Sequence, residues 1–307
     1  MPTPQSAILP EPRPNALFLV LRVNDPAADA SAIGKIFSGL EKTIVAVRKL
    51  DKGKSKLVAS VAFGSEFWDR LTLGKRPKFL KPFSPVKGPS LEAPTTGGDV
   101  LLHILSDRHD LNFELAMRLR AELGERVSVM EEVHGFRYLD SRDLTGFIDG
   151  TENPKGKGRG PAAIIGKEDP DFAGGSYVFT QRYVHNFQKW RGLSLQDQER
   201  AVGRTKKNSR EIPDKKRDAQ AHISRVVIEE NGKELEIVRH SFPYGTTSEA
   251  GLFFIAYTRD LRIPFKMLER MMGASGDGRH DLLMENTKPV SGATFFAPSV
   301  QMLKKLG

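Results

Sequence analysis

The sequence predicts an α+β fold in which one arrangement of strands and helices is used twice. Short apolar runs rich in strand-forming residues alternate with helical patterns along the whole chain. The order of these elements suggests the same unit before and after residue 150. At 307 residues the chain also exceeds what one core usually supports, because single cores stop growing at roughly 250 to 300 residues. We therefore expect two domains, residues 1–150 and 151–307.

The first half reads as a β-α-β-β-α-β order, which is that of the split, ferredoxin-like unit. The expected elements are a strand at 15–23, a helix at 28–50, a strand at 56–64, a short helix at 65–71, a strand at 99–106, a helix at 111–123 and a closing strand or pair of strands at 127–139. Residues 73–98 are rich in proline and glycine. They predict a long irregular segment of the kind that often wraps a site.

The second half resumes this pattern, and we expect the functional site to lie largely in it. The expected elements are a strand at 176–186, a helix at 194–204, strands at 221–228, 235–242 and 251–260, a helix at 264–273, and residues 294–299 before a helical tail. Ser194 and Asp197 have the spacing of a capping box, which marks the start of the first of these helices.

The composition excludes several classes of site. The chain has no cysteine, which rules out disulfides, iron–sulfur clusters held by the chain and cysteine zinc sites. It has no apolar run of about 18 residues, so we expect no membrane span. The proline-rich lead before the first apolar stretch has no basic n-region. We therefore expect no export signal and a cytoplasmic location.

The charge balance is basic, with a formal net charge of +9. Such a surplus could attract nucleic acid or anionic small molecules, and its sign alone does not choose between them. Part of it lies in two clusters, at 155–160 and 204–218, which we interpret as solvated loops. No aromatic RNA-binding signature is interleaved with these clusters, so a nucleic-acid binder is the weaker interpretation and we expect no nucleic-acid partner.

The most informative segment is GFIDGTENP at 146–154, where Asp149 lies among glycines. Gly146 and Gly150 permit backbone angles and close approaches that other residues resist, so a large flat ligand could lie against the main chain. A carboxylate held in such a turn is placed for chemistry. The ordinary alternative is a β-turn with a solvated aspartate.

Arg239 is singled out by strand periodicity. Alternation over 234–241 places it on one face with Leu235, Ile237 and Ser241. A guanidinium does not lose its charge, so on a buried face it needs a carboxylate, an anion or a place where negative charge develops. The alternative is an arginine at a strand end whose head reaches water.

Three motifs together resemble the dye-decolorizing peroxidases, and in particular their bacterial B-type branch: GFIDGTENP at 146–154, AHISRV at 221–226 and IVRHSFPYGT at 237–246. The likeness extends over nearly the full chain. It implies two ferredoxin-like domains with antiparallel sheets, and haem b bound mainly in the C-terminal half. It also implies reduction of hydrogen peroxide through a ferryl and porphyrin-radical intermediate, with dyes, phenolics or other small molecules as electron donors.

The resemblance also assigns roles to residues. Of seven histidines, His222 matches the iron ligand, and a thiolate ligand is excluded because cysteine is absent. Asp149 would move the peroxide proton, and Arg239 would stabilise the charge on the departing oxygen. The further candidates are Asp281 as the carboxylate behind His222, Ser241 in the distal water network, and Arg204, Thr151, Glu152 and Asn153 as partners of the haem propionates. For Asp281, an acid at a helix N-terminus is an equal alternative.

Two further expectations concern activity and assembly. Because a free aspartate titrates near pH ~3.9, an aspartate base predicts an acidic optimum. A haem-binding or haem-handling protein with incidental peroxidase turnover is the alternative function, and it would place little demand on Asp149 and Arg239. By family likeness we expect a homo-oligomer, a dimer or higher, and the sequence makes no prediction about packaging in a larger compartment.

Overall fold

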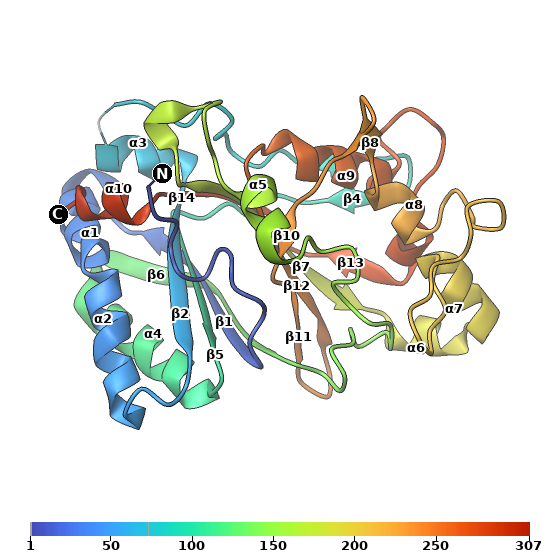
Figure 1. The fold of residues 1–307 in the computed structure, drawn as a ribbon, viewed down its shortest axis with the longest axis horizontal. Coiled ribbons are helices and arrows are strands. Elements are labelled where there is room, and N and C mark those ends of the chain that lie inside the picture. Colours follow the sequence, from blue (N-terminus) through green and yellow to red (C-terminus); the bar gives the residue numbers. More distant parts are fainter. Residues whose placement is uncertain (1, 73) are drawn as a thin grey trace.

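The computed structural model describes residues 2–72 and 74–307 and has the expected α+β fold (Figure 1). Most of the first half of the chain lies on one side of the view and most of the second half on the other. The last helix, α10 (Val300–Lys304), returns to the first half and lies beside α1 (Pro26–Ser38).

The first half contributes four long strands, β1 (Asn15–Val23), β2 (Leu57–Gly64), β5 (Val100–Ser106) and β6 (Val127–Phe136). Their order in the sheet is β6-β1-β5-β2, and their pairings are antiparallel. The helices of this half are α1, α2 (Leu40–Arg48), α3 (Ser65–Thr72) and α4 (His109–Leu123). In the expected irregular segment the described residues, 74–98, hold only the short strands β3 (Val86–Lys87) and β4 (Glu92–Ala93). Residue 73 lies outside the described residues.

The expectation of one helix over 28–50 is wrong, because the helix is interrupted at Gly39. Asp25 accepts hydrogen bonds from the amides of Ala27 and Ala28 and starts α1, with Pro26 in its first turn. Gly39 ends α1 and precedes α2. The closing element at 127–139 is the single strand β6.

The second half contributes β7 (Ser176–His185), β11 (Phe242–Gly245), β12 (Ala250–Thr258) and β14 (Ala293–Ala297). Short strands add β8 (Glu229–Glu230), β9 (Lys233–Glu234), β10 (Val238–Arg239) and β13 (Thr287–Pro289). The helices are α5 (Arg159–Ala163), α6 (Phe187–Gly192), α7 (Leu195–Val202), α8 (His222–Val226), α9 (Arg262–Met272) and α10. Ser194 caps α7 as expected and accepts a hydrogen bond from the Asp197 amide.

The two halves have the same strand order. In the second half the order is β14-β7-β12-β11, so each half places its fourth strand beside its first, then its third and its second. Pairing of β6 with β11 and of β2 with β14 joins the two sets into one continuous sheet within the described residues. The expected repeat is thus present, and the halves share a sheet instead of packing as separate bodies.

The alternating side chains of β1 show how this sheet divides the core. Leu17, Leu19 and Leu21 belong to the core cluster that includes residues of α1, α2 and α4. Phe18, on the other face, stacks on Phe253 of β12 with ring centroids 4.2 Å apart. Both faces of β1 are therefore buried, which explains its nearly unbroken apolar sequence.

The expectation of a strand at 221–228 is wrong, because His222–Val226 forms the short helix α8. Burial here alternates along the chain, with Ala221, Ile223 and Arg225 buried, so the sequence imitates a strand. Tertiary contacts decide the outcome. The Arg225 guanidinium donates to Asp277 Oδ2 at 2.6 Å and to the Arg270 carbonyl at 3.0 Å, which ties α8 to α9 and the loop that follows it.

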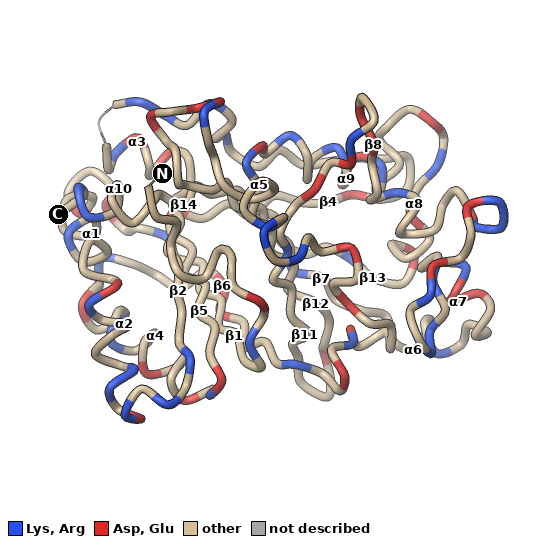
Figure 2. Tube along the Cα trace, in the orientation of Figure 1, with Lys and Arg blue, Asp and Glu red and all other residues tan. Residues whose placement is uncertain are grey.

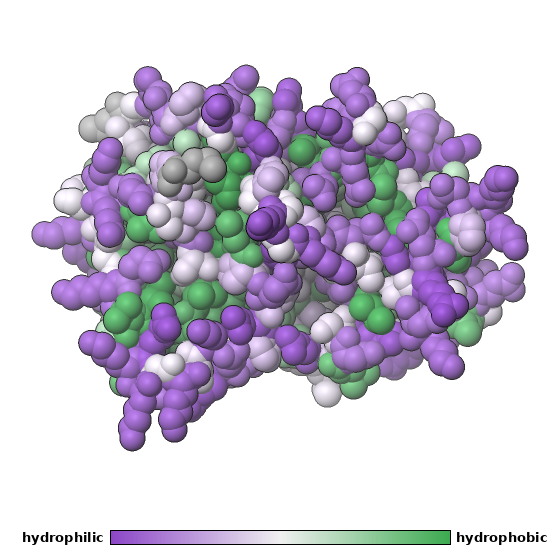
Figure 3. All heavy atoms as spheres, in the orientation of Figure 1, coloured by the Kyte–Doolittle hydropathy of each residue, from purple (hydrophilic) through white to green (hydrophobic). Residues whose placement is uncertain are grey.

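Lys and Arg are distributed over both halves (Figure 2), and hydrophilic side chains cover most of the face in Figure 3. The interpretation of both basic clusters as solvated loops is wrong in part, because Arg159 is buried and Arg217 is largely covered. Among residues 2–72 and 74–307, no helix is long and apolar enough to cross a membrane.

Candidate active site

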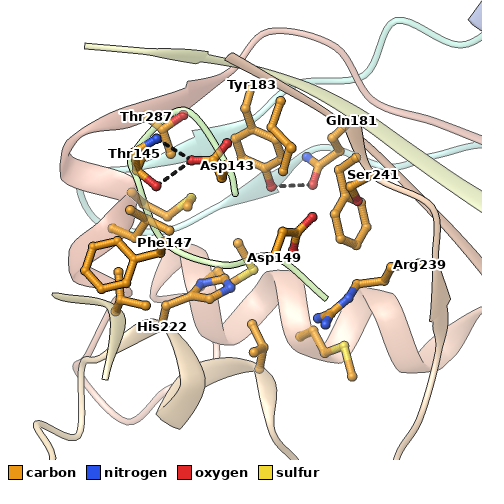
Figure 4. A pocket seen from close by; sticks show the side chains of 18 of the residues that line it. Asp143, Thr145, Phe147, Asp149, Gln181, Tyr183, His222, Arg239, Ser241 and Thr287 are labelled. Atoms are coloured by element: carbon orange, nitrogen blue, oxygen red, sulfur yellow. Dashed lines mark hydrogen bonds between the residues drawn. The ribbon is translucent and has the colours of Figure 1, made fainter. Parts of the chain in front are cut away.

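A cavity lies between the second-half sheet and helices α8 and α9 (Figure 4). It encloses about 1040 Å³ of space free of protein atoms, including solvent at its mouth. Its walls are mostly apolar, and its polar groups come from a few elements. The loop before residue 150 supplies Asp143 and Asp149, α8 supplies His222, and the β10 segment supplies Arg239 and Ser241.

The loop that carries Asp149 is held by its own backbone and by one arginine. Arg142 donates to the carbonyls of Gly146 at 2.8 Å and Lys206 at 2.7 Å, and the Asp149 amide donates to Ser141 at 3.0 Å. Gly146 has φ of 91°, and a Cβ there would lie 2.5 Å from Lys206 Cε. The turn therefore favours glycine because of its angle, whereas the flexible end of the Lys206 side chain could move aside for a Cβ.

Asp149 faces the cavity with one carboxylate oxygen free. Oδ1 accepts from the Gly150 amide at 2.6 Å, and Oδ2 has no protein partner among the described residues. The side chain keeps accessible surface because it borders the cavity, yet protein surrounds it. Burial raises the pKa of this carboxyl, the charge of Arg239 offsets part of the rise, and the nearby Asp143 adds to it.

Arg239 is fixed through its backbone while its side chain stays free. The side-chain amide of Asn153 accepts a hydrogen bond from the backbone N–H of Arg239 and donates one to the backbone carbonyl of Arg239, both at 2.9 Å. Val238 and His240 are buried on the opposite side, so the expected alternation around Arg239 is confirmed. Within the described part of the chain, Arg239 Nε and Ser241 Oγ are buried without a hydrogen-bond partner. Such atoms normally find one, so they mark a place for a ligand or water.

His222 and Asp281 form a pair in which the acid is fully buried and the imidazole is 29% exposed. His222 Nδ1 lies 2.6 Å from Asp281 Oδ2, and Asp281 Oδ1 accepts from the Leu283 amide at 2.9 Å. Asp281 is fully buried and also caps the 3₁₀ turn Leu282–Glu285, so the two interpretations of this acid do not exclude each other, and its role behind an iron ligand stays a prediction. A carboxylate on Nδ1 directs the other ring nitrogen, Nε2, to any ligand in the cavity.

The remaining candidates lie outside this lining. The guanidinium of Arg204 pairs with Glu152 and Glu211 and donates to the Ser209 carbonyl at 2.6 Å. Neither Arg204, Thr151 nor Glu152 borders the cavity, and Asn153 borders only a neighbouring one. Their role with propionates stays a prediction.

A second polar network in the wall was missed from the sequence. His185 Nε2 lies 3.1 Å from Asp143 Oδ2, and its Nδ1 lies 2.7 Å from Thr287 Oγ1. Burial alone would raise the pKa of Asp143, but hydrogen bonds from His185 and Thr145 outweigh it and lower the pKa. The available signal was that His185 falls on the same face of β7 as Phe179, Gln181 and Tyr183, which also line the cavity.

Comparisons with known proteins agree with this arrangement. Two family models match, "Dyp-type peroxidase, N-terminal" over residues 5–137 and "Dyp-type peroxidase, C-terminal" over residues 140–302. The division at residue 150 stays a prediction. The chain is 42% identical to the dye-decolorizing peroxidase of Mycolicibacterium paratuberculosis, across 98% of this chain and 85% of the relative.

Two solved structures are also similar. DyPB from Rhodococcus jostii RHA1 is 40% identical with a TM-score of 0.96, covering 99% of this chain and 98% of the other. A variant of the same protein, in complex with heme, is 39% identical with a TM-score of 0.95, covering 98% of each chain.

Proposed function

Since the chain belongs to the Dyp-type peroxidase family, we propose that its cavity binds haem b with His222 as the iron ligand. The protein is a peroxidase that reduces hydrogen peroxide and oxidises dyes, phenolics or other small donors. A haem-handling role is not favoured, because the relative that is 42% identical over 98% of this chain is named a dye-decolorizing peroxidase. The cytoplasmic location and the homo-oligomeric state stay predictions of the sequence.

The residues present fit a haem. The walls supplied by Leu252, Phe254, Met267, Leu268 and Met271 suit an apolar macrocycle. His222 can bind iron through Nε2, because Asp281 occupies Nδ1. A bound haem would supply the iron that activates peroxide and would store two oxidising equivalents. All residues that line the cavity lie between Asp143 and Thr287, which supports binding mainly by the second half.

Asp149 serves as the proton carrier in this proposal. Its free Oδ2 accepts a proton from hydrogen peroxide and returns it to the outer oxygen, which leaves as water. The raised pKa of Asp149 makes it a stronger base towards the peroxide proton, and a group that both takes and returns a proton works best when its pKa lies near the working pH.

Arg239 supplies the positive charge in the cavity that Asp149 also borders. Its guanidinium has no protein partner among the described residues, so it can stabilise negative charge on the departing oxygen without first breaking an ion pair. Asn153 holds the backbone of Arg239 and so fixes where that charge lies. This combination of an unpaired guanidinium, a free carboxylate oxygen and an oriented imidazole around one cavity is the observation that carries the proposal.

One spectrum tests the cofactor and its ligand. The purified protein should show a Soret band, and His222→Ala should lose it or bind haem far more weakly. The pyridine haemochrome spectrum should be that of haem b. A full Soret band in His222→Ala would contradict the assignment of the ligand.

Transient kinetics test the chemistry. Asp149→Asn and Arg239→Leu should still bind haem, but each should react with peroxide far more slowly than the unsubstituted protein. If both variants react at the original rate, the haem-handling function becomes the better explanation.

A further inference from the structure

A second cavity adjoins the site and opens at the surface; we call it the vestibule. Its lining comes from the N-terminal arm at 11–13, the end of β6, residues 141–155, Arg159 and the β10–β11 segment. It encloses about 980 Å³ of space free of protein atoms, including open solvent. Asp149, Arg239 and Ser241 line both cavities, so the vestibule reaches the proposed catalytic groups.

The vestibule is strongly cationic. Its charged residues are Arg13, Arg137, Arg142, Lys155, Arg159 and Arg239 against Glu11 and Asp149. Two of the cations are paired with acids that do not line it, Arg13 with Asp107 and Arg142 with Asp140. The side chains of Arg137 and Lys155 are exposed and have no partner among residues 2–72 and 74–307. Positive charge therefore exceeds negative charge around the opening.

Arg159 adds a buried charge beneath this surface. Its side chain is only 4% exposed, and it donates to the carbonyls of Leu9 at 2.7 Å and Pro10 at 2.9 Å. The nearest acid, Glu11, is 3.6 Å away and 69% exposed. A guanidinium keeps its charge when buried, and carbonyl dipoles do not cancel that charge. Its field consequently extends into the vestibule. Blue segments next to α5 in Figure 2 mark this region.

The same cavity has flat apolar walls. Phe136, which is 37% exposed, and Tyr138 stand in the lining with Pro12, Pro154 and Pro243. Hydrogen peroxide is small and uncharged, so it uses neither these rings nor the excess of cations. Aromatic and proline surfaces beside unpaired cations suit a flat anion instead.

We propose that the vestibule binds a small aromatic carboxylate, such as a hydroxybenzoate, as the electron donor of the enzyme. This inference rests on the proposed function. Each donor gives up one electron and its phenolic proton, and two donors with one peroxide yield two phenoxyl radicals and two waters. The ring lies against the aromatic and proline walls, and the carboxylate lies toward Arg137 and Lys155.

Isothermal titration calorimetry of the haem-loaded protein tests this with 4-hydroxybenzoate and its uncharged analogue 4-hydroxybenzamide. Near neutral pH the carboxylate should bind at least about fivefold more tightly than the amide. In a solvent-filled cavity the attraction between a carboxylate and two nearby cations is weakened by water, so a larger difference is not required. The difference should shrink as salt is added.

Matched variants locate the site. The double variant Arg137→Gln, Lys155→Gln should lose about fivefold in affinity for the carboxylate and little for the amide. The control Lys215→Gln, Lys216→Gln removes the same charge from an exposed loop that lines neither cavity. Equal binding of carboxylate and amide, an unchanged Arg137/Lys155 variant, or an equal loss in the control would each overturn the proposal. The measurement reports binding, so a protein that binds the donor but fails with peroxide would contradict only the proposed function.

Discussion

Replacing Asp281 with asparagine removes the negative charge next to His222 but keeps the size and shape of the side chain. The carboxylate is fully buried and serves two donors, His222 Nδ1 at 2.6 Å and the Leu283 amide at 2.9 Å. Asparagine offers one oxygen and one NH₂ group in the same space, so it can accept from only one of these donors. If the NH₂ group faces His222, the imidazole must carry its proton on Nε2, where it blocks iron. If the oxygen faces His222, the Leu283 amide loses its acceptor.

The magnitude follows from these two outcomes. Loss of a buried acceptor costs about 1–3 kcal/mol, so chemical denaturation of the haem-free Asp281→Asn protein should show that loss. Substituting the partner of a metal-binding histidine typically costs about 10- to 100-fold in affinity, and haem titration should show a loss of this size. The haem that still binds should have a higher reduction potential, because the neutral amide donates less electron density through His222.

The chain offers a matched control in the same turn. His280 Nε2 lies within hydrogen-bond distance of Glu285 Oε1, at 3.0 Å, and this glutamate is 42% exposed. Glu285→Gln changes the same kind of pair at the surface, so haem affinity and potential should stay as they were. Wild-type haem affinity together with an unchanged potential in Asp281→Asn would refute the reasoning.

Five further predictions concern the loop and its neighbours. Asp149→Asn should slow the reaction with peroxide by about 10²- to 10⁴-fold in stopped-flow measurements, because the proton carrier is lost. Asp149 must be ionised to act as a base, and its pKa is raised. The rate of the reaction with peroxide should therefore fall as the pH is lowered, with a midpoint above the ordinary aspartate value of ~3.9. Arg239→Leu should slow the same step by about 10²- to 10³-fold, and Asn153→Ala should slow it less, because the guanidinium remains but its backbone loses two hydrogen bonds. Gly146→Ala should destabilise the protein by about 1–3 kcal/mol in chemical denaturation, because φ is 91° and Lys206 lies close.

Each of these has an outcome that would count against it. Gly160→Ala is the control for Gly146, since a Cβ there meets nothing within 4 Å, and equal effects would remove the argument from strain. An activity that peaks above about pH 8 would count against Asp149 as the base, because a free aspartate titrates near pH ~3.9. If Asn153→Ala is slower than Arg239→Leu, Asn153 acts on more than the position of Arg239.

The sequence determined most strands and the repeat, because strands buried on both faces leave short apolar runs rich in strand-forming residues. It also located the groups proposed for catalysis, since Asp149, His222 and Arg239 each lie in a short motif. All three border one cavity.

Only the tertiary structure decided which distant residues meet. His222 and Asp281 are 59 residues apart, and a helix N-terminal acid was an equal interpretation until the chain brought them together. Residues 222–226 alternate in burial like a strand, yet the bonds of Arg225 to Asp277 and Arg270 hold them as a helix. Arg159 looked solvated within a basic run, but the N-terminal arm covers it. Local patterns record how each segment is buried, whereas partners across the fold depend on how the sheet and the loops over it bring distant segments together.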